Sequence, residues 1–300
     1  MLTADEPTGA FEAERPRLVR LAYRMLGSLG EAEDVVQDAW IRWRQVDHSE
    51  VASPGAFLSR TVTRLCLDVM KSARVQRETY FGTWLPEPLA TTPEDDLGDD
   101  ITLTLMLALE RLSPLERAAF ILHDVFGVPL DEIAATLDRE ASAVRQLASR
   151  ARKHVQAAKP RFPLDREEGT RIAKAFFEAS TSGDVAALRA MLADSVVVHS
   201  DGGGKAHAFP RPIVGIERVS RMFEGVARKS WIQQARKLQD LWIDGLPGYF
   251  SLEPGDAFQT VALEIENGLI VGIYFTRNPD KLERLVERFG GGAATSPTTH

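Results

Sequence analysis

The spacing of apolar residues changes once along this chain, at Pro160–Arg161–Phe162–Pro163. Before this point the apolar residues recur at intervals of three and four, which is typical of amphipathic helices. Proline cannot continue a helix and biases the residue before it toward extended geometry, so these four residues end the helical half. Beyond them, a helix over 168–179 and a Gly183–Asp184 turn lead into strand-like segments. The sequence therefore predicts a multidomain protein with an all-α half and an α+β half.

The helical half divides into two predicted domains, residues 10–80 and residues 105–160. Breaks at 27–30 and 53–55 separate three helices in the first. The second contains a predicted helix-turn-helix, because Ser113–Pro114 is typical of a helix start and a tight turn at 138–140 joins two later helices. The predicted helices of this domain span 113–126, 130–137 and 141–157.

Residues 81–104, between the two helical domains, form a predicted linker. From Leu85 to Asp100 there are six acidic residues and three prolines without one Lys or Arg. Proline favours extended backbone and like charges repel, so we expect an extended, acidic, Pro-containing linker.

Residues 166–289 form a predicted α+β domain of ordinary single-domain length. Asn267–Gly268 between two apolar runs is a strong signal for a two-residue hairpin turn. Residues 290–300 consist almost entirely of small and polar residues, a composition that predicts disorder. The predicted strands are Val196–His199, Trp231–Ile232, Leu241–Ile243, Phe258–Ile265 and Leu269–Phe275.

The composition narrows the class of protein. In 300 residues, 44% are hydrophobic and 26% charged, which is the balance of a soluble globular chain. No apolar run approaches the ~20 residues that a bilayer span needs, so we expect a cytoplasmic protein without membrane contact. The single cysteine, Cys66, excludes an internal disulfide and a thiolate metal site, and we predict neither metal nor cofactor.

The helix predicted around 34–46 has a polar face with one apolar residue at its centre. Placed on a helical wheel, Asp34, Gln37, Asp38 and Gln45 surround Ile41, while the other apolar side chains fall on the opposite side. An isolated exposed isoleucine is common on protein surfaces. The alternative interpretation is a docking face in which polar residues surround one apolar anchor.

The next predicted helix, from Phe57 to about Arg74, gathers cations on one face. These are Arg60, Arg64, Lys71 and Arg74, opposite a stripe that includes Cys66. A solvated basic face and a phosphate-binding face both fit this pattern.

The last helix of the helix-turn-helix carries the strongest charge signal. Between Arg139 and Arg161 there are seven Lys or Arg against one acid, Glu140, although the whole chain has a net charge of −7. Arg and Gln make bidentate contacts to guanine and adenine edges, and Ser bonds to either. This face predicts DNA binding in a major groove. Its outward residues are Ser142, Arg145, Gln146, Ser149, Arg150 and Lys153.

Three segments of the helical half resemble known sequences. Glu33–Asp34–Val35–Val36–Gln37–Asp38–Ala39–Trp40 resembles the polymerase-docking helix of sigma domain two in extracytoplasmic-function (ECF) sigma factors. Ser113–Arg117 and Ala143–Arg152 are similar to their sigma domain four. Together the matches cover Phe11 to Lys159, and the remaining half is similar to a SnoaL-like, NTF2-like domain. The resemblance implies two all-α sigma domains followed by an α+β SnoaL/NTF2-like cone.

Three short motifs place the chain in one subgroup. They resemble the signatures of ECF sigma factors with a fused SnoaL-like C-terminal domain, which implies a regulatory role in cis for each. The motifs are Trp84–Leu85–Pro86–Glu87–Pro88, Asp201–Gly202–Gly203–Gly204–Lys205 and Asn278–Pro279–Asp280–Lys281–Leu282.

The resemblance also assigns partners. It implies a sigma factor that binds core RNA polymerase, through the β′ clamp helices and the β subunit, and directs initiation at specific promoters. The face around Ile41 would bind the clamp helices, the basic face from Arg60 to Arg74 would contact the minus-ten element, and the face around Arg145 would enter the minus-thirty-five major groove. The acidic linker would thread through the polymerase's RNA channel. No catalytic residue is required, because the polymerase performs the chemistry.

The C-terminal domain leaves several interpretations open. NTF2-like cones enclose a pocket, and related folds abstract protons with one base and an oxyanion donor. No spacing here identifies such a pair, and whether the pocket holds a small molecule is not decided by the sequence. The three glycines at 202–204 predict either a close backbone approach or a flexible loop. The candidate pocket residues are His199, Asp201, Lys205, His207, Trp231, Trp242 and Tyr274.

Two other functions remain as alternatives. A helix-turn-helix regulator with a ligand-sensing domain would bind duplex DNA without polymerase and would not need the face around Ile41. A SnoaL-type isomerase or cyclase with a DNA-binding arm would need a catalytic base. Transcription with core polymerase distinguishes both from a sigma factor.

Overall fold

The structure is a computed structural model that describes residues 6–78, 80, 82–92, 102–156, 164–229 and 233–291, with the backbone alone at residue 6 and at 73–78. It divides into two compact units, which are considered separately. The first contains the described residues of Met1–Thr79 and Leu105–Lys159. The second contains those of Tyr80–Thr104 and Pro160–His300. Among the described residues, no helix is both long enough and apolar enough to cross a bilayer.

The first three helices of the first unit are α1 (Glu6–Leu26), α2 (Leu29–Trp43) and α3 (Pro54–Glu78), with a short 3-10 helix at His48–Glu50 before α3. Gly27 separates α1 from α2 in a left-handed conformation that glycine adopts without strain. The Ser28 side chain then accepts a hydrogen bond from the Glu31 backbone N–H, which caps α2. The three predicted helices are confirmed, although α2 ends at Trp43 and leaves Gln45 just beyond it.

The helix-turn-helix is also confirmed. The helices here are α4 (Leu103–Glu110), α5 (Pro114–Phe120), α6 (Leu130–Leu137) and α7 (Ala141–Val155). Ser113 and Glu116 form a reciprocal capping box at the start of α5. The predicted single helix to Phe126 is wrong in its last part, because Ile121–Val125 continues as a π-helical turn. Asp138, in a left-handed conformation, ends α6 and redirects the chain into α7.

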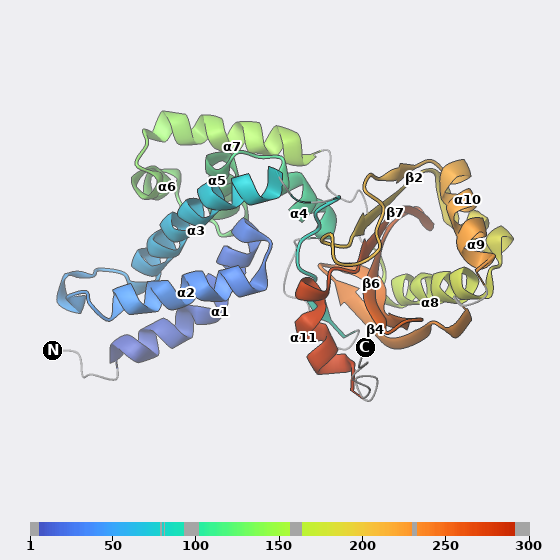
Figure 1. The fold of residues 1–300 in the computed structure, drawn as a ribbon. Coiled ribbons are helices and arrows are strands. Elements are labelled where there is room, and N and C mark those ends of the chain that lie inside the picture. The colour runs from blue at the N-terminus through green and yellow to red at the C-terminus, as the bar shows by residue number, and fades with distance from the viewer. Residues whose placement is uncertain are drawn as a thin grey trace. The chain divides into compact units, whose positions relative to one another are not determined.

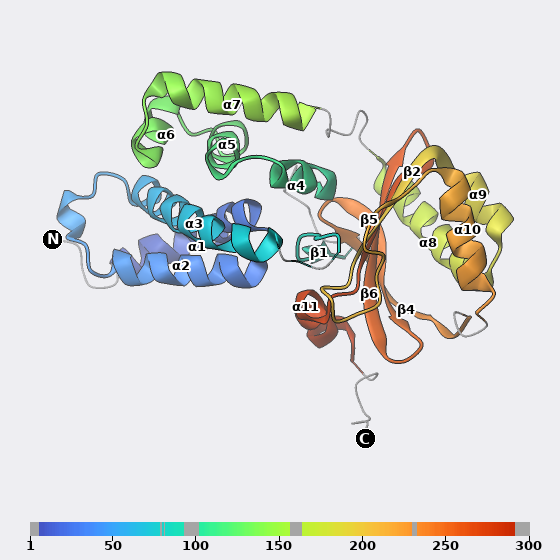
Figure 2. The ribbon, with the colours of Figure 1, turned by 45° about the horizontal axis from the view of Figure 1, so that its top comes forward.

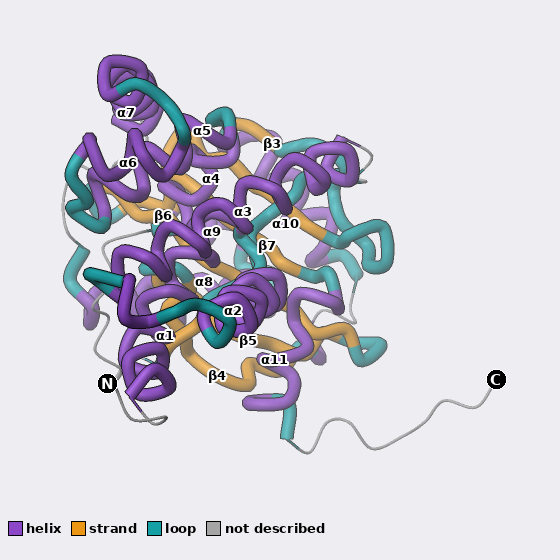
Figure 3. The backbone as a smooth tube through the Cα atoms, turned by 90° about the vertical axis from the view of Figure 1, so that its left-hand side faces the viewer, coloured by secondary structure: helices purple, strands orange, loops and turns teal. Residues whose placement is uncertain are grey.

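The two helical domains pack into one unit. Buried Arg117 donates hydrogen bonds to the carbonyl oxygens of Met25 (2.7 Å) and Leu109 (2.9 Å) and pairs with Glu110. Because its donors are shared between the end of α1 and the end of α4, this guanidinium joins the two domains. Within the unit, α7 lies at one end, α1 and α2 at the other, and α3 and α5 between them (Figures 1 and 3).

The second unit is built on a mixed seven-stranded sheet in the order β1-β4-β5-β6-β7-β2-β3. Only β2 and β7 pair in parallel among these strands. Asn267 and Gly268, both at positive φ, form the hairpin turn between β6 and β7 that the sequence predicts. The strands are β1 (Ala90–Thr91), β2 (Leu192–Asp201), β3 (Ile213–Val214), β4 (Arg236–Ile243), β5 (Leu246–Glu253), β6 (Ala257–Glu266) and β7 (Leu269–Thr276).

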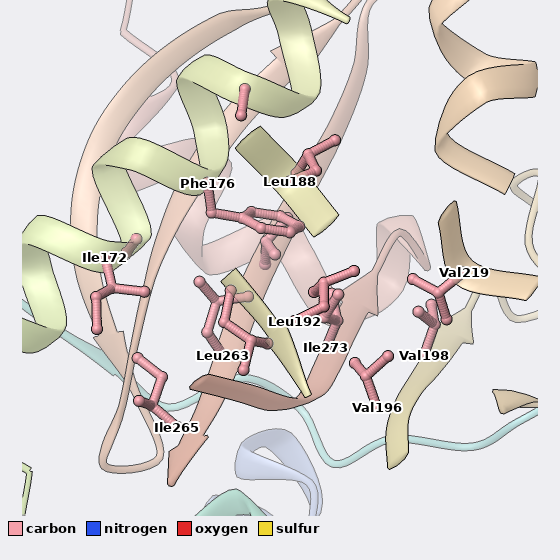
Figure 4. Packing of buried hydrophobic residues seen from close by; sticks show 14 of the residues in the cluster. Ile172, Phe176, Leu188, Leu192, Val196, Val198, Val219, Leu263, Ile265 and Ile273 are labelled. Atoms are coloured by element: carbon pink, nitrogen blue, oxygen red, sulfur yellow. The ribbon is translucent and has the colours of Figure 1, made fainter. Parts of the chain in front are cut away.

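Helices cover this sheet on two sides. In Figure 2, α8 (Arg166–Ser182), α9 (Val185–Met191) and α10 (Ile216–Ala227) lie on one side of the curved sheet, and α11 (Pro279–Phe289) lies on the other. Figure 4 shows the Phe176 ring pointing from α8 toward Leu263 and Ile273. All three side chains are buried, so this core fixes α8 on the sheet.

Some elements were not predicted, and some predictions about segment structure need correction or cannot be compared. The strand β5 and the helix α10 were not predicted, since Gly245, Pro247 and Gly248 interrupt the first and no capping residue marks the second. The segment predicted as an extended linker contains β1 and packs as part of the second unit. The predicted strand Trp231–Ile232, residues 81 and 93–101 of the linker and residues 292–300 lie outside the described residues.

Candidate polymerase, promoter and regulatory sites

The predicted polymerase-docking face is exposed on α2 and just beyond it. Asp34, Gln37, Asp38 and Gln45 are all exposed, and Ile41 between them has 48% of its surface accessible. The opposite side of α2 is anchored by Val35, Val36, Ala39 and Trp43, which are buried. The helical wheel therefore predicted correctly which side of α2 is exposed and which side is buried.

The predicted basic face of α3 is only partly free. Arg60 is exposed, and Lys71 is exposed with an ion pair to Asp68 at 2.9 Å. Arg64 is exposed too, but its Nε and Nη2 atoms donate to the carbonyl oxygens of Thr136 and Ala135 at 3.0 and 3.3 Å. Carbonyl groups at a helix C-terminus attract cations, so the end of α6 holds this guanidinium. The side chain of Arg74 lies outside the described residues.

The outward face of α7 is exposed along its length. Val144, Ala148, Ala151 and Val155 bury the opposite side of the helix. Arg152, by contrast, is turned toward Asp124 and forms an ion pair with it at 2.6 Å. The exposed residues include all six of this helix that were predicted to contact DNA, namely Ser142, Arg145, Gln146, Ser149, Arg150 and Lys153.

The three regulatory motifs converge in the second unit around one buried carboxylate, Asp201 at the end of β2. Its side chain has 0% exposure and accepts hydrogen bonds from the hydroxyl of Tyr80 (2.6 Å) and the backbone N–H of Leu85 (2.9 Å). Lys281 completes the ion pair with Asp201 at 2.8 Å and also donates to the carbonyl oxygen of Leu85. Asn278 donates to the Tyr80 hydroxyl at 3.0 Å. We call these five residues the linker clasp.

Aromatic and hydrogen-bonding contacts reinforce the linker clasp. The Lys281 ammonium lies 4.4 Å from the centre of the Trp84 ring and 5.1 Å from that of Tyr80, within the range of cation–π attraction. Burial raises the pKa of the Tyr80 hydroxyl, and its hydrogen bond to Asp201 raises that pKa further. Tyr80 therefore stays protonated as a donor to Asp201.

The glycines of the second motif make a close backbone approach rather than a loose loop. Gly203 has φ +60°, and a Cβ atom there would overlap the side-chain amide of Asn278. A Cβ atom on Gly202 would overlap the carbonyl oxygen of Ala206. Gly204 is exposed, and Lys205 at the end of the motif forms an exposed ion pair with Asp280 at 2.6 Å.

The third motif starts α11. Asn278 caps the helix by accepting a hydrogen bond from the Asp280 backbone N–H, and Pro279 occupies the first turn. Leu282, one residue after Lys281, is buried. The predicted turn before a helix is therefore present, and its capping residue also belongs to the linker clasp.

The rest of the first motif lies on the same domain. Leu85, Pro86 and Pro88 are buried, and Glu87 lies 3.6 Å from Arg284 of α11. Farther along, Ala90 and Thr91 pair with Ile243 and Trp242 of β4. The motifs gave no indication of Tyr80 and Arg284, because neither lies within the three signatures.

A cavity of about 660 Å³ opens between α8, α10 and the sheet. Among the candidate pocket residues, His207 lines it, whereas His199, Asp201, Lys205, Trp242 and Tyr274 do not. The prediction is wrong for those five: Asp201 is in the linker clasp, Lys205 pairs with Asp280, and Tyr274 donates to Glu264 at 2.8 Å. Trp231 lies outside the described residues.

The polar residues of the cavity were not predicted. Buried Glu253 accepts hydrogen bonds from Gln259 (2.7 Å) and Ser251 (3.3 Å), and burial raises the pKa of its carboxyl. Burial lowers the pKa of Arg277, an effect that the negative charge of Glu253 opposes. Glu253 ends β5, which was not predicted, and Arg277 directly follows β7. No spacing in the sequence could therefore have indicated that these two residues line the same cavity. No group of three or more His, Cys, Asp or Glu within the described part is arranged to hold a metal ion.

Comparison with known proteins assigns two regions of the chain to protein families. Residues 10–76 match the family model of sigma-70 region 2, and residues 102–155 match that of sigma-70 region 4. The first unit therefore contains almost all of the residues that match sigma-70 regions 2 and 4.

Full-length relatives define the family. The ECF RNA polymerase sigma factor SigJ of Mycobacterium tuberculosis is 34% identical over 90% of this chain and 91% of its own length. The probable ECF RNA polymerase sigma factor SigI of the same species is 32% identical over 96% of this chain and 99% of its own length. The crystal structure of SigJ superposes with a TM-score of 0.75, covering 92% of this chain and 98% of that one. The chain belongs to the ECF RNA polymerase sigma factors, which are not enzymes.

Proposed function

We propose that this sigma factor binds core RNA polymerase through the α2 face around Ile41 and reads promoter DNA with α3 and α7. The observation that carries the proposal is charge segregation. In a chain of net charge −7, the whole outward face of α7 is exposed and cationic, and its inner face is buried. The partner of the α2 face is the pair of β′ clamp helices, and the β subunit is a further contact.

The C-terminal domain regulates initiation in cis through the linker clasp. To pass through the polymerase, residues 80–92 must be extended and free. The linker clasp instead holds Tyr80 and Leu85 against Asp201, and β1 adds the following residues to the sheet. A closed linker clasp therefore lowers the fraction of molecules that can assemble on polymerase, and release of the linker raises it.

The first experiment is transcription in vitro with core polymerase and a promoter selected from random sequences. The full chain is compared with a truncation before Thr170. A promoter-dependent transcript supports the sigma assignment. Its absence from both forms, each shown to be folded by circular dichroism, would falsify that assignment.

A second comparison addresses regulation. Asp201→Asn weakens the pair with Lys281 while leaving α2, α3 and α7 unaltered, and we expect it to give more transcript than the wild type. Lys205→Met, which removes an exposed ion pair from the same motif, is the matched control and should leave transcription unchanged. Less transcript from Asp201→Asn than from the control would contradict an inhibitory linker clasp.

A further inference from the structure

The cavity of the second unit has the size and walls of a ligand site. Its volume of about 660 Å³ lies within the range of ~300–1,000 Å³ found for small-molecule pockets. Aromatic and thioether side chains from α8, α10 and β7 form much of its lining, and the buried ones are held by the core. The apolar lining residues used here are Phe176, Phe177, Met222, Phe223 and Phe275.

The charged residues of this lining are mostly cationic. Arg218, Arg221, Lys229 and Arg277 line the cavity together with one acid, Glu253. This excess is opposite in sign to the charge of the whole chain, which is −7. The Oε1 atom of Glu253 already accepts two hydrogen bonds from within the protein, so its charge is partly satisfied before any ligand enters.

Arg277 is the cation whose hydrogen bonds are incomplete. Its Nε atom is buried and has no hydrogen-bond partner among the described residues. A buried donor without a partner costs free energy, and an anion in the cavity would supply the missing acceptor. Arg277 is one of the residues that line the cavity, so the acceptor would arrive from the cavity side.

We propose that this cavity binds an amphipathic anion, with an apolar body against the aromatic walls and a single negative group paired with Arg277. A carboxylate on an aliphatic or aromatic skeleton has this chemistry. A cation would face four positive side chains, and a neutral apolar molecule would leave the Arg277 donor unsatisfied.

Occupancy of the cavity is coupled to the linker clasp, a consequence that rests on the proposed function of the clasp. Ser200 and Arg277 line the cavity, and the next residue after each, Asp201 and Asn278, belongs to the linker clasp. The backbone N–H groups of Arg277 and Asn278 donate to the carbonyl oxygen of Asp201 at 2.7 and 3.0 Å. An anion that holds Arg277 therefore favours the closed linker clasp.

Two fluorescent probes with the same aromatic body test the binding site in the full chain. The anion 1-anilinonaphthalene-8-sulfonate carries a sulfonate, and N-phenyl-1-naphthylamine lacks it. We expect the anion to bind with one site per chain, and Arg277→Gln to weaken its affinity by about tenfold or more while leaving the neutral probe unchanged. Arg171→Gln, on the exposed side of α8 and paired with Glu168, is the matched control.

A second variant distinguishes cavity binding from adsorption. Gly225 lines the cavity, and a Cβ atom there would meet no atom within 4 Å. Gly225→Leu therefore adds bulk at the wall of the cavity with no clash at Cβ and also favours the helix, so it should fold, and we expect it to lose both probes. Retention of the anionic probe by Gly225→Leu, or equal affinity in Arg277→Gln and the wild type, would overturn the proposed site.

Hydrogen–deuterium exchange of residues 82–92 tests the coupling. Saturating anionic probe should slow exchange of this segment in the wild type and have no effect in Gly225→Leu. Unchanged exchange in the wild type would refute the coupling to the linker clasp. These measurements need no polymerase, so loss of transcription with intact probe binding would contradict only the proposed function.

Discussion

Removing the ammonium of Lys281 should open the linker clasp. In Lys281→Met the side chain keeps most of its apolar length but loses the ion pair with Asp201, whose exposed fraction is 0%. Removing one partner of a buried ion pair typically costs about 3–5 kcal/mol, because the other charge stays buried. Here Tyr80 and the Leu85 and Gly203 N–H groups still donate to Asp201, so the lower end of this range applies.

The assay is hydrogen–deuterium exchange of the Leu85 amide, which donates to Asp201 in a buried setting. A loss of about 3 kcal/mol in the free energy of local opening corresponds to exchange about a hundredfold faster. Lys205→Met is the control, because its ion pair with Asp280 is exposed and contributes at most about 1 kcal/mol. The amide of Ile273 in the sheet core reports whether the whole unit has lost stability.

A double-mutant cycle makes this prediction specific. Asp201→Asn together with Lys281→Met removes both charges, so the double variant should be less destabilised than the two single effects added together. Unchanged exchange at Leu85 in Lys281→Met, or strictly additive effects in the cycle, would refute the account of the linker clasp as a buried ion pair. Equal acceleration at Leu85 and Ile273 would refute local opening.

Three further predictions address other sites. Ile41→Asp should abolish retention by core polymerase in a pull-down without unfolding the chain. Val214→Asp, at a comparably exposed residue, should bind polymerase normally. Equal retention of the two variants would exclude the α2 face as the polymerase-binding surface. Arg145→Ala should weaken promoter binding by about 1–3 kcal/mol in an electrophoretic mobility assay and relax base preference at one upstream position; unchanged selectivity would mean that another residue reads the groove. Burial raises the pKa of the Glu253 carboxyl, so its ionisation costs stability as pH rises through that pKa. Glu253→Gln should therefore raise the melting temperature relative to wild type at pH 8 but not at pH 4, and a pH-independent difference would contradict this.

Helix faces could be predicted from the sequence because a helix has a fixed period. The exposed and buried sides of α2 and α7 follow from residue spacing alone. Ile41 lies on the exposed side of α2, and Val144 lies on the buried side of α7. Short motifs also predicted the backbone conformation correctly where neighbouring residues determine it. Examples are the helix start at Ser113 and the hairpin turn at Asn267–Gly268. In these segments the physical cause lies within a few residues, so no knowledge of the fold was needed.

Contacts between distant segments could not be predicted in the same way. The acidic and proline-rich composition of 81–104 indicated an extended linker, yet Leu85 is buried and Ala90 pairs with Ile243 of β4. The sequence shows that such a segment is extended but does not show which surface it contacts. Likewise, Arg277 and Glu253 come together only because the sheet curves around the cavity.

Arg64 shows how the packing of the first unit bears on promoter recognition. Its guanidinium donates to the carbonyl oxygens of Ala135 and Thr136 at the end of α6. A guanidinium has a fixed set of donors in one plane, so the same donors cannot also bind a phosphate. If Arg64 binds the minus-ten element, as we propose, through the Nε and Nη2 donors that now contact α6, the contact between α3 and α6 must break when the promoter is bound. Promoter affinity then includes the free energy of separating these two helices, and Arg60, which has no such contact with α6 among the described residues, is the residue that can bind DNA first.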